Sequence, residues 1–152
     1  MFKHKGKVIA LLCCVAGLIA YGQDSPLKVE IKLAHAAVNN FEPLSVATSI
    51  RNTGKEVQIL DIWSCSYPTQ WTADSPSVRV NLVSCKKNDL LHITLKPGEA
   101  CERPLLIRVE LPGGNSSPEP LTFRLGFTAA AFATGQQNAP IWSDPAIVTV
   151  NK

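Results

Sequence analysis

Methionine, histidine and paired metal ligands are scarce in this sequence. The 152 residues include 1 methionine, which is the initiator, and 3 histidines. The lack of an internal methionine excludes thioether copper sites, and neither a C-x-x-C pair nor an H-x-x-x-H pair is present. A zinc or copper site built from the three later cysteines and a histidine is the alternative. We expect no metal site and no cofactor.

Sequence signatures of catalysis are lacking as well. No G-x-S-x-G motif marks a nucleophilic serine. The carboxylates of Asp61, Asp74, Glu99 and Asp144 are scattered among turns and strand edges, without the close pairing that a glycosidase dyad requires. We therefore expect that the protein is not an enzyme.

Clustered positive charge is missing once the first residues are set aside. The formal net charge is +3, and Lys3, Lys5 and Lys7 supply all of that excess. After residue 22 there are 15 − 3 = 12 basic and 12 acidic residues, so the net charge of that part is 0. Lys86-Lys87 is the only basic pair in it. Binding to phosphate backbones needs a clustered basic footprint, so we expect no nucleic-acid partner.

Only one long apolar run is present, and it lies near the start of the chain. It covers the 13 residues from Val8 to Ala20, fewer than the roughly 20 of a membrane-spanning helix. Preceding lysines and the small residues before Gln23 indicate a secretory signal peptide over residues 1–22. We expect an exported protein, periplasmic or secreted, without a membrane span. Residues 23–152 suit one domain, since domains cluster at roughly 100 to 150 residues.

The rest of the chain shows strand patterns and no convincing helical period. Short runs rich in Val, Ile, Leu, Phe and Thr alternate with turn residues, and several have apolar side chains at every second position. Eight runs can be drawn: 27–36, 44–51, 56–63, 77–83, 90–95, 103–111, 121–129 and 146–150. They predict an antiparallel β-sandwich of seven to eight strands. A small barrel is the alternative.

Three cysteines follow the leader: Cys65, Cys85 and Cys101. If the strands form a simple meander, Cys65 and Cys101 lie at one end and Cys85 at the other. A six-residue strand spans roughly 20 Å, well beyond the roughly 7 Å limit between the Cα atoms of a disulfide. Geometry alone therefore favours pairing Cys65 with Cys101. A fold-back of residues 64–76, which two prolines interrupt, would instead bring Cys65 beside Cys85.

Several motifs together resemble immunoglobulin-like or fibronectin-type sandwich domains of exported bacterial proteins. These are Ser49-Ile50-Arg51-Asn52-Thr53-Gly54, Leu95-Lys96-Pro97-Gly98-Glu99, Phe123-Arg124-Leu125-Gly126-Phe127 and Trp142-Ser143-Asp144-Pro145. The resemblance implies an immunoglobulin-like fold and export, and it is silent on activity. It favours a disulfide between Cys65 and Cys85, with Cys101 left as a free thiol. No disulfide, or an intermolecular one, is the alternative.

A fainter similarity, in the Asn-Thr-Gly and Leu-x-Pro-Gly-Glu segments, is to the sandwich fold of a bacterial intracellular proteinase inhibitor. No inhibitory residue is carried over. The similarity makes a proteinase inhibitor of β-sandwich fold the alternative function.

The stretch from Ile62 to Trp71, IWSCSYPTQW, holds an unusual share of the aromatic residues. As structure, it is a flap that a bridge from Cys65 to Cys85 would stabilise by roughly 3 kcal/mol. As a site, Tyr67, Gln70 and Trp71 form a candidate binding surface, since loops at sandwich ends often bind partners. We predict a non-enzymatic binding or structural module that contacts an unknown protein or a cell-envelope component.

Overall fold

The computed structural model describes residues 25–112, 117–130 and 139–151. The predicted signal peptide at 1–22 lies outside these residues. The described part forms twelve strands and one short 3₁₀ helix. Their bounds are β1 Leu27–Leu33, β2 Ala37–Asn39, β3 Pro43–Asn52, β4 Gln58–Trp63, η1 Tyr67–Gln70, β5 Trp71–Ala73, β6 Val78–Val80, β7 Leu90–Leu95, β8 Ala100–Val109, β9 Glu119–Phe123, β10 Leu125–Phe127, β11 Ile141–Trp142 and β12 Ala146–Asn151. The all-β fold class is confirmed.

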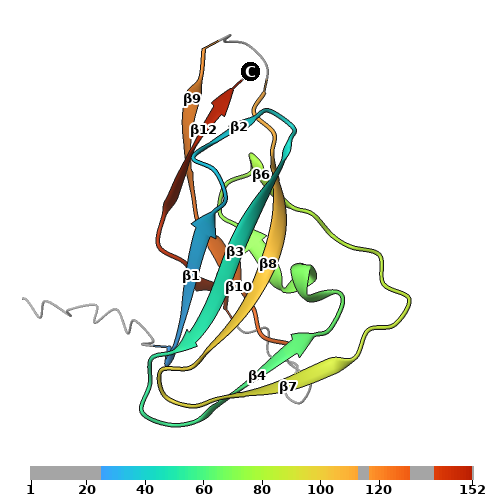
Figure 1. Cartoon of the computed structure of the whole chain (residues 1–152), viewed down its shortest axis with the longest axis vertical. Coiled ribbons are helices and arrows are strands. Elements are labelled where there is room, and N and C mark those ends of the chain that lie inside the picture. The colour runs from blue at the N-terminus through green and yellow to red at the C-terminus, as the bar shows by residue number, and fades with distance from the viewer. Residues whose placement is uncertain (1–24, 113–116, 131–138, 152) are drawn as a thin grey trace, which may run out of the picture.

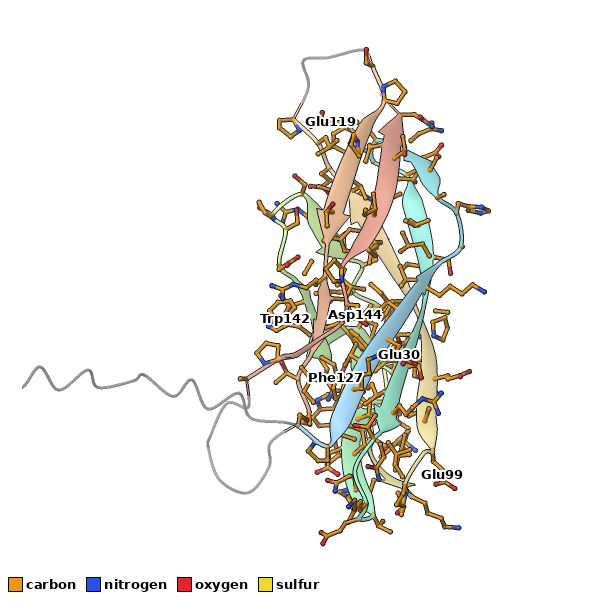
Figure 2. The ribbon with its side chains drawn as sticks, turned by 90° about the vertical axis from the view of Figure 1, so that its left-hand side faces the viewer. Glu30, Glu99, Glu119, Phe127, Trp142 and Asp144 are labelled. Carbon is orange, nitrogen blue, oxygen red and sulfur yellow. A yellow bond between two sulfur atoms is a disulfide. The ribbon has the colours of Figure 1, made fainter. Side chains whose placement is uncertain are left out.

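The strands form four sheets that share one apolar core. The largest has the order β1-β3-β8-β6, and all of its neighbours are antiparallel. Two three-stranded sheets have the orders β11-β10-β5 and β2-β12-β9, and β4 pairs with β7. The molecule is elongated, and β1, β3 and β8 run along its length (Figures 1 and 2).

Alternating side chains explain how the largest sheet encloses the core. Along β3, Leu44, Val46 and Ile50 are buried, whereas the intervening Ser45 and Ala47 are exposed. Successive side chains of a strand point to opposite faces, so one face of β3 packs inward. The same alternation buries Leu105, Ile107 and Val109 of β8. Phe123 of β9 and Leu125 and Phe127 of β10 are buried in the same core.

The middle of the chain does not form the simple meander that the cysteine geometry assumed. In that meander, residues 77–83 lie between 56–63 and 90–95. Instead β4 pairs directly with β7, and β6 joins the edge of β8 in the other sheet. Strand β6 also ends at Val80, before the end of the predicted run 77–83, and Leu82 beyond it is 67% exposed.

The single strand predicted over residues 121–129 is two strands. At Arg124 the chain leaves the β12 partner of β9 and, as β10, pairs with β5 and β11. Both the backbone N–H and the Nε of Arg124 donate hydrogen bonds to the Asp74 carboxylate, at 2.7 and 2.8 Å. Because this N–H is committed to a side chain, the ladder breaks here. The split, and the short β2, β5 and β11, raise the strand number above seven to eight.

Candidate binding surface

The stretch from Ile62 to Trp71 leaves β4, makes the single turn η1 and reverses into β5. Pro68 is the second residue of this turn, a position where its missing N–H costs no hydrogen bond. The turn brings Gln70 and Trp71 back beneath β4, and both are buried, at 7% and 5% exposure. The prediction that Gln70 and Trp71 form an exposed recognition surface is therefore wrong.

The side-chain amide of Gln70 forms hydrogen bonds with backbone groups that a neighbouring strand would otherwise bind. Its side-chain Oε1 accepts a hydrogen bond from the Trp63 backbone N–H at 2.8 Å. Its Nε2 donates to the carbonyl oxygens of Asp61 and Thr128, at 3.1 and 3.2 Å. One amide side chain has the donors and the acceptor to satisfy all three groups. Gln70 thus joins the free edge of β4 to the end of β10.

Trp71 and Tyr67 also pack inward. The Trp71 ring lies 5.3 Å from the Phe127 ring, measured between centroids, with the planes tilted by 58°. The Tyr67 hydroxyl donates to the Pro104 carbonyl oxygen on β8, and the rest of its side chain packs against the core. Burial raises the pKa of this hydroxyl, and the positive charge of Arg103 opposes that effect. Both aromatics anchor η1 to the sheets.

The disulfide between Cys65 and Cys85 is confirmed, with 5.9 Å between the Cα atoms. Of the three cysteines that the structure describes, Cys101 is the free thiol, and it is buried on β8 opposite Ile50. Geometry had favoured Cys65 with Cys101 only because it assumed a meander. The reversal at η1 instead lets the segment after β6 pass beside Cys65.

The disulfide braces an exposed segment that sequence reasoning did not single out, residues 81–89 between β6 and β7. We call it the braced loop. It runs outside the body of the strands on the right-hand side of Figure 1. Leu82 and Val83 are 67% and 51% exposed, and the neighbouring Lys86 and Lys87 are exposed too. The sequence signal that could have pointed to this loop is the basic pair Lys86-Lys87 directly after Cys85.

Hydrogen bonds hold both ends of the braced loop. At its start, the Asn81 N–H donates to the Leu106 carbonyl oxygen at 2.8 Å. At its end, the Asp89 carbonyl oxygen accepts from the Ser64 N–H at 2.8 Å, and the Asp89 N–H donates to the Ser64 Oγ at 2.9 Å. These bonds extend the antiparallel pairing of β4 with β7 by one step.

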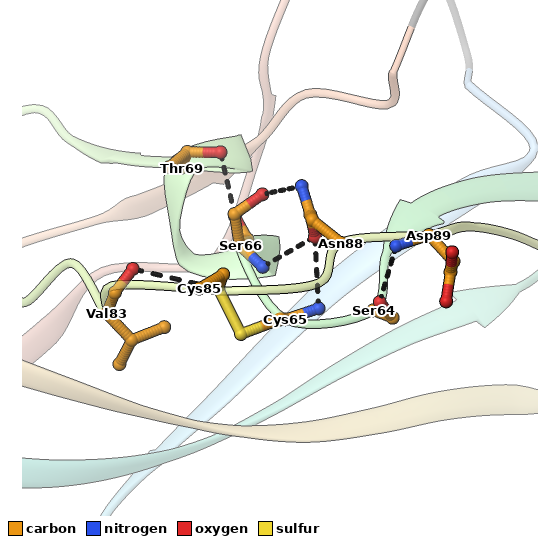
Figure 3. Close-up of a disulfide and its surroundings, with 8 residues drawn as sticks. All are labelled: Ser64, Cys65, Ser66, Thr69, Val83, Cys85, Asn88 and Asp89. Atoms are coloured by element: carbon orange, nitrogen blue, oxygen red, sulfur yellow. Dashed lines mark hydrogen bonds between the residues drawn. A yellow bond between two sulfur atoms is a disulfide. The ribbon is translucent and has the colours of Figure 1, made fainter.

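Asn88 adds a second brace next to the disulfide (Figure 3). Its Oδ1 accepts hydrogen bonds from the backbone N–H groups of Cys65 and Ser66, at 3.2 and 3.0 Å. Its Nδ2 donates to the Ser66 Oγ at 2.6 Å. Lys86 and Lys87 lie between these two braces, and both side chains are exposed.

Charged pairs elsewhere on the surface have ordinary ion-pair geometry. His92 and Asp61 lie opposite each other on β7 and β4, with 2.6 Å between Nδ1 and Oδ1. Hydrogen bonds from the Arg124 side chain and then its backbone N–H hold the pKa of Asp74 below its ordinary value. Lys28 contacts both Glu30 and Asp144, which Figure 2 labels near β1.

Two general features of the described ranges bear on binding. Their one helix is the single turn η1, and nothing helical in them has the length and apolar character of a membrane span. Within the same residues, no group of three or more His, Cys, Asp or Glu side chains is arranged to hold a metal ion.

Comparison with known proteins identifies no family. Neither a protein-family description nor a curated protein matches the sequence. Among solved structures, native alpha-2-macroglobulin from Escherichia coli, spanning domain MG7 to the C-terminus, matches 83% of this chain with 16% identity and a TM-score of 0.48. Spo0M, a sporulation control protein from Bacillus subtilis, matches 84% with 15% identity and a TM-score of 0.45. The chain covers 16% and 50% of those two chains, respectively.

Proposed function

We propose that this protein is an exported, non-enzymatic binding module, and that the braced loop is its contact surface for a protein of the cell envelope or the medium. The observation that carries the proposal is the loop itself. It presents two apolar and two basic side chains to solvent. A disulfide and the hydrogen bonds of Ser64 and Asn88 hold its backbone.

Such bracing favours binding for a physical reason. Ordering a flexible loop on association costs roughly 0.5–1.5 kcal/mol for each immobilised rotamer-rich side chain, in addition to its backbone entropy. In the braced loop much of the backbone cost is already met during folding. Exposed apolar side chains next to charged ones also suit a protein partner, whose interface combines an apolar centre with a polar rim.

The fold and compartment in this proposal rest on separate observations. We infer an immunoglobulin-like sandwich because the inward faces of the β3–β8 sheet and of the sheets containing β4, β10 and β12 contribute to one core. We infer export because a closed disulfide persists in oxidising compartments, in agreement with the leader-like residues 1–22. Sequencing the N-terminus of the exported protein tests this part, and a start at Gln23 is expected.

The binding proposal is tested by affinity capture from envelope and culture-medium fractions of the producing cell. A loop variant carries Leu82→Ser, Val83→Ser and Lys86→Ala. A matched control carries Ile147→Ser and Lys55→Ala, which remove an exposed apolar residue and an exposed lysine elsewhere. Circular dichroism and thermal melting verify that each variant is folded.

We expect the wild-type protein and the control to retain the same specific partner, and the loop variant to lose it. Equal retention by the loop variant would show that the contact surface lies elsewhere. Absence of any partner that the wild-type protein retains would refute the proposal as a whole.

A further inference from the structure

We propose that the braced loop binds in the active-site cleft of a serine endopeptidase that cleaves after basic residues, with Lys86 in its specificity pocket. This inference rests on the proposed function and names the class of partner. The protein would then act as a substrate-like inhibitor of that enzyme.

Charge and accessibility select Lys86. Its side chain is exposed, and among the described residues it takes part in no ion pair. The neighbouring Lys87 is engaged instead, with 3.4 Å between its Nζ and the Asp89 Oδ2. A protease that cleaves after lysine or arginine carries an aspartate in its specificity pocket. Lys86 is therefore the cation of this loop that is free to reach such a carboxylate.

The backbone on both sides of Lys86 is irregular and accessible. Residues 81–85 and 87–89 belong to no helix, strand or turn, and Lys86 lies at a bend. Proteases bind several residues on both sides of the scissile bond, so the neighbours of Lys86 must be accessible as well. Ser84, Lys87, Asn88 and Asp89 are all exposed.

The braces decide between an inhibitor and an ordinary substrate. An unsupported lysine in an exposed loop is a preferred site of proteolytic nicking. Here the scissile bond, Lys86–Lys87, lies between two fixed points. On one side Cys85 is bonded to Cys65. On the other side Asn88 and Asp89 are hydrogen-bonded to residues 64–66.

The chemistry follows from that tethering. Attack of the enzyme's serine oxygen on the Lys86 carbonyl carbon breaks the C–N bond to Lys87 and forms an ester with Lys86. The Lys87 nitrogen takes up the proton that the serine hydroxyl gives up and becomes a free amine. Since the braces hold this amine beside the ester, its effective concentration stays high. The reverse attack restores the peptide bond and the serine hydroxyl, in competition with water.

The test uses the full exported protein with trypsin as the probe. Residual amidase activity is measured against protein concentration, and mass spectrometry with and without reduction follows cleavage at Lys86–Lys87. We expect tight inhibition by the wild-type protein, with slow and incomplete cleavage. Lys86→Ala should weaken inhibition about 100-fold, as for a buried anchor of an interface. Lys55→Ala, at a distant exposed lysine, should have no effect.

Asn88→Ala removes the side-chain hydrogen bonds of the braced loop and leaves the disulfide in place. The variant therefore tests the role of these bonds in a protein that should still fold. We expect this variant to bind trypsin at first and then to be cleaved at Lys86–Lys87, so that the inhibition fades with time. Removing the disulfide should have the same consequence, and thermal melting identifies a variant that simply fails to fold.

Three results would overturn the inference: a folded wild-type protein that does not inhibit trypsin, rapid cleavage at Lys86–Lys87 without inhibition, or inhibition that survives Lys86→Ala. These outcomes are distinguishable from failure of the proposed function. If the loop variant loses a partner from the envelope that is not a protease, and trypsin is unaffected, the binding function stands and this inference fails. If capture does not depend on the loop either, both fail.

Discussion

Removal of the disulfide between Cys65 and Cys85 should lower the free energy of unfolding by about 3 kcal/mol. The two cysteines are 20 positions apart in sequence. On the chain-entropy model, closing a loop of that size removes about 11 cal/mol/K of entropy from the unfolded ensemble, which is about 3 kcal/mol at 25 °C. In the native state, Ser64, Ser66 and Asn88 hold the same backbone by hydrogen bonds. Most of the change should therefore arise in the unfolded chain.

Urea unfolding of the wild-type protein and of a Cys65→Ala, Cys85→Ala double variant measures this loss. The dependence of the unfolding free energy on urea should also become steeper in the variant, because an uncrosslinked unfolded chain exposes more surface. Reduced wild-type protein should match the variant. A decrease in unfolding free energy of less than about 1 kcal/mol would refute the chain-entropy reasoning. A decrease of more than about 5 kcal/mol would show that the braced loop loses its native conformation without the disulfide.

Three further predictions follow from groups inside or beside the core. Gln70→Leu should lower the free energy of unfolding, measured in urea, by about 2–4 kcal/mol, because the Trp63 N–H and the Thr128 carbonyl oxygen would lose their bonds to the amide, whereas the Asp61 carbonyl oxygen would keep its bond from the Ala130 N–H. The lowered pKa of Asp74 implies stability that is fully present above about pH 4 and is lost as the pH falls through the native pKa. Asp74→Asn should therefore flatten the acid limb of stability measured against pH. Cys101 is buried, so it should resist an alkylating reagent in the folded protein and react once on unfolding, and fast modification of the native protein would contradict its position.

Strands with regular alternation were predictable from the sequence, and long-range pairing was not. The bounds of β7 are those expected, and β3 and β8 differ only at their ends, since a period of two directly reflects the two faces of a strand. The pairing of β4 with β7 across 26 intervening residues depends on which edges meet. No local pattern specifies that choice, and the assumed meander was therefore wrong.

Side-chain polarity misled the prediction at two places of the candidate site. Gln70 looked like an exposed loop residue, yet it is buried because its amide completes the hydrogen bonds of a strand edge. Leu82 and Val83 are the apolar end of the run 77–83 that was predicted as a strand, yet both are exposed beyond the end of β6. Burial is decided by which backbone groups need partners as well as by hydrophobicity, and that need is visible only in the folded chain.

The disulfide between Cys65 and Cys85 has two proposed roles, stabilising the fold and restraining the braced loop, and experiment can separate them. The disulfide stabilises the fold mainly by restricting the unfolded chain. Stabilising substitutions elsewhere should therefore restore the unfolding free energy that is lost with it. As a brace of the loop it acts on the native state, where it limits how far the ends at Lys86 and Lys87 move apart after cleavage. A disulfide-free variant restored to wild-type stability by distant substitutions should therefore regain its melting temperature but still lose the partner or be cleaved. If binding returned together with stability, the hydrogen bonds of Asn88 and Ser64 alone would suffice to hold the loop, and the disulfide would serve folding only.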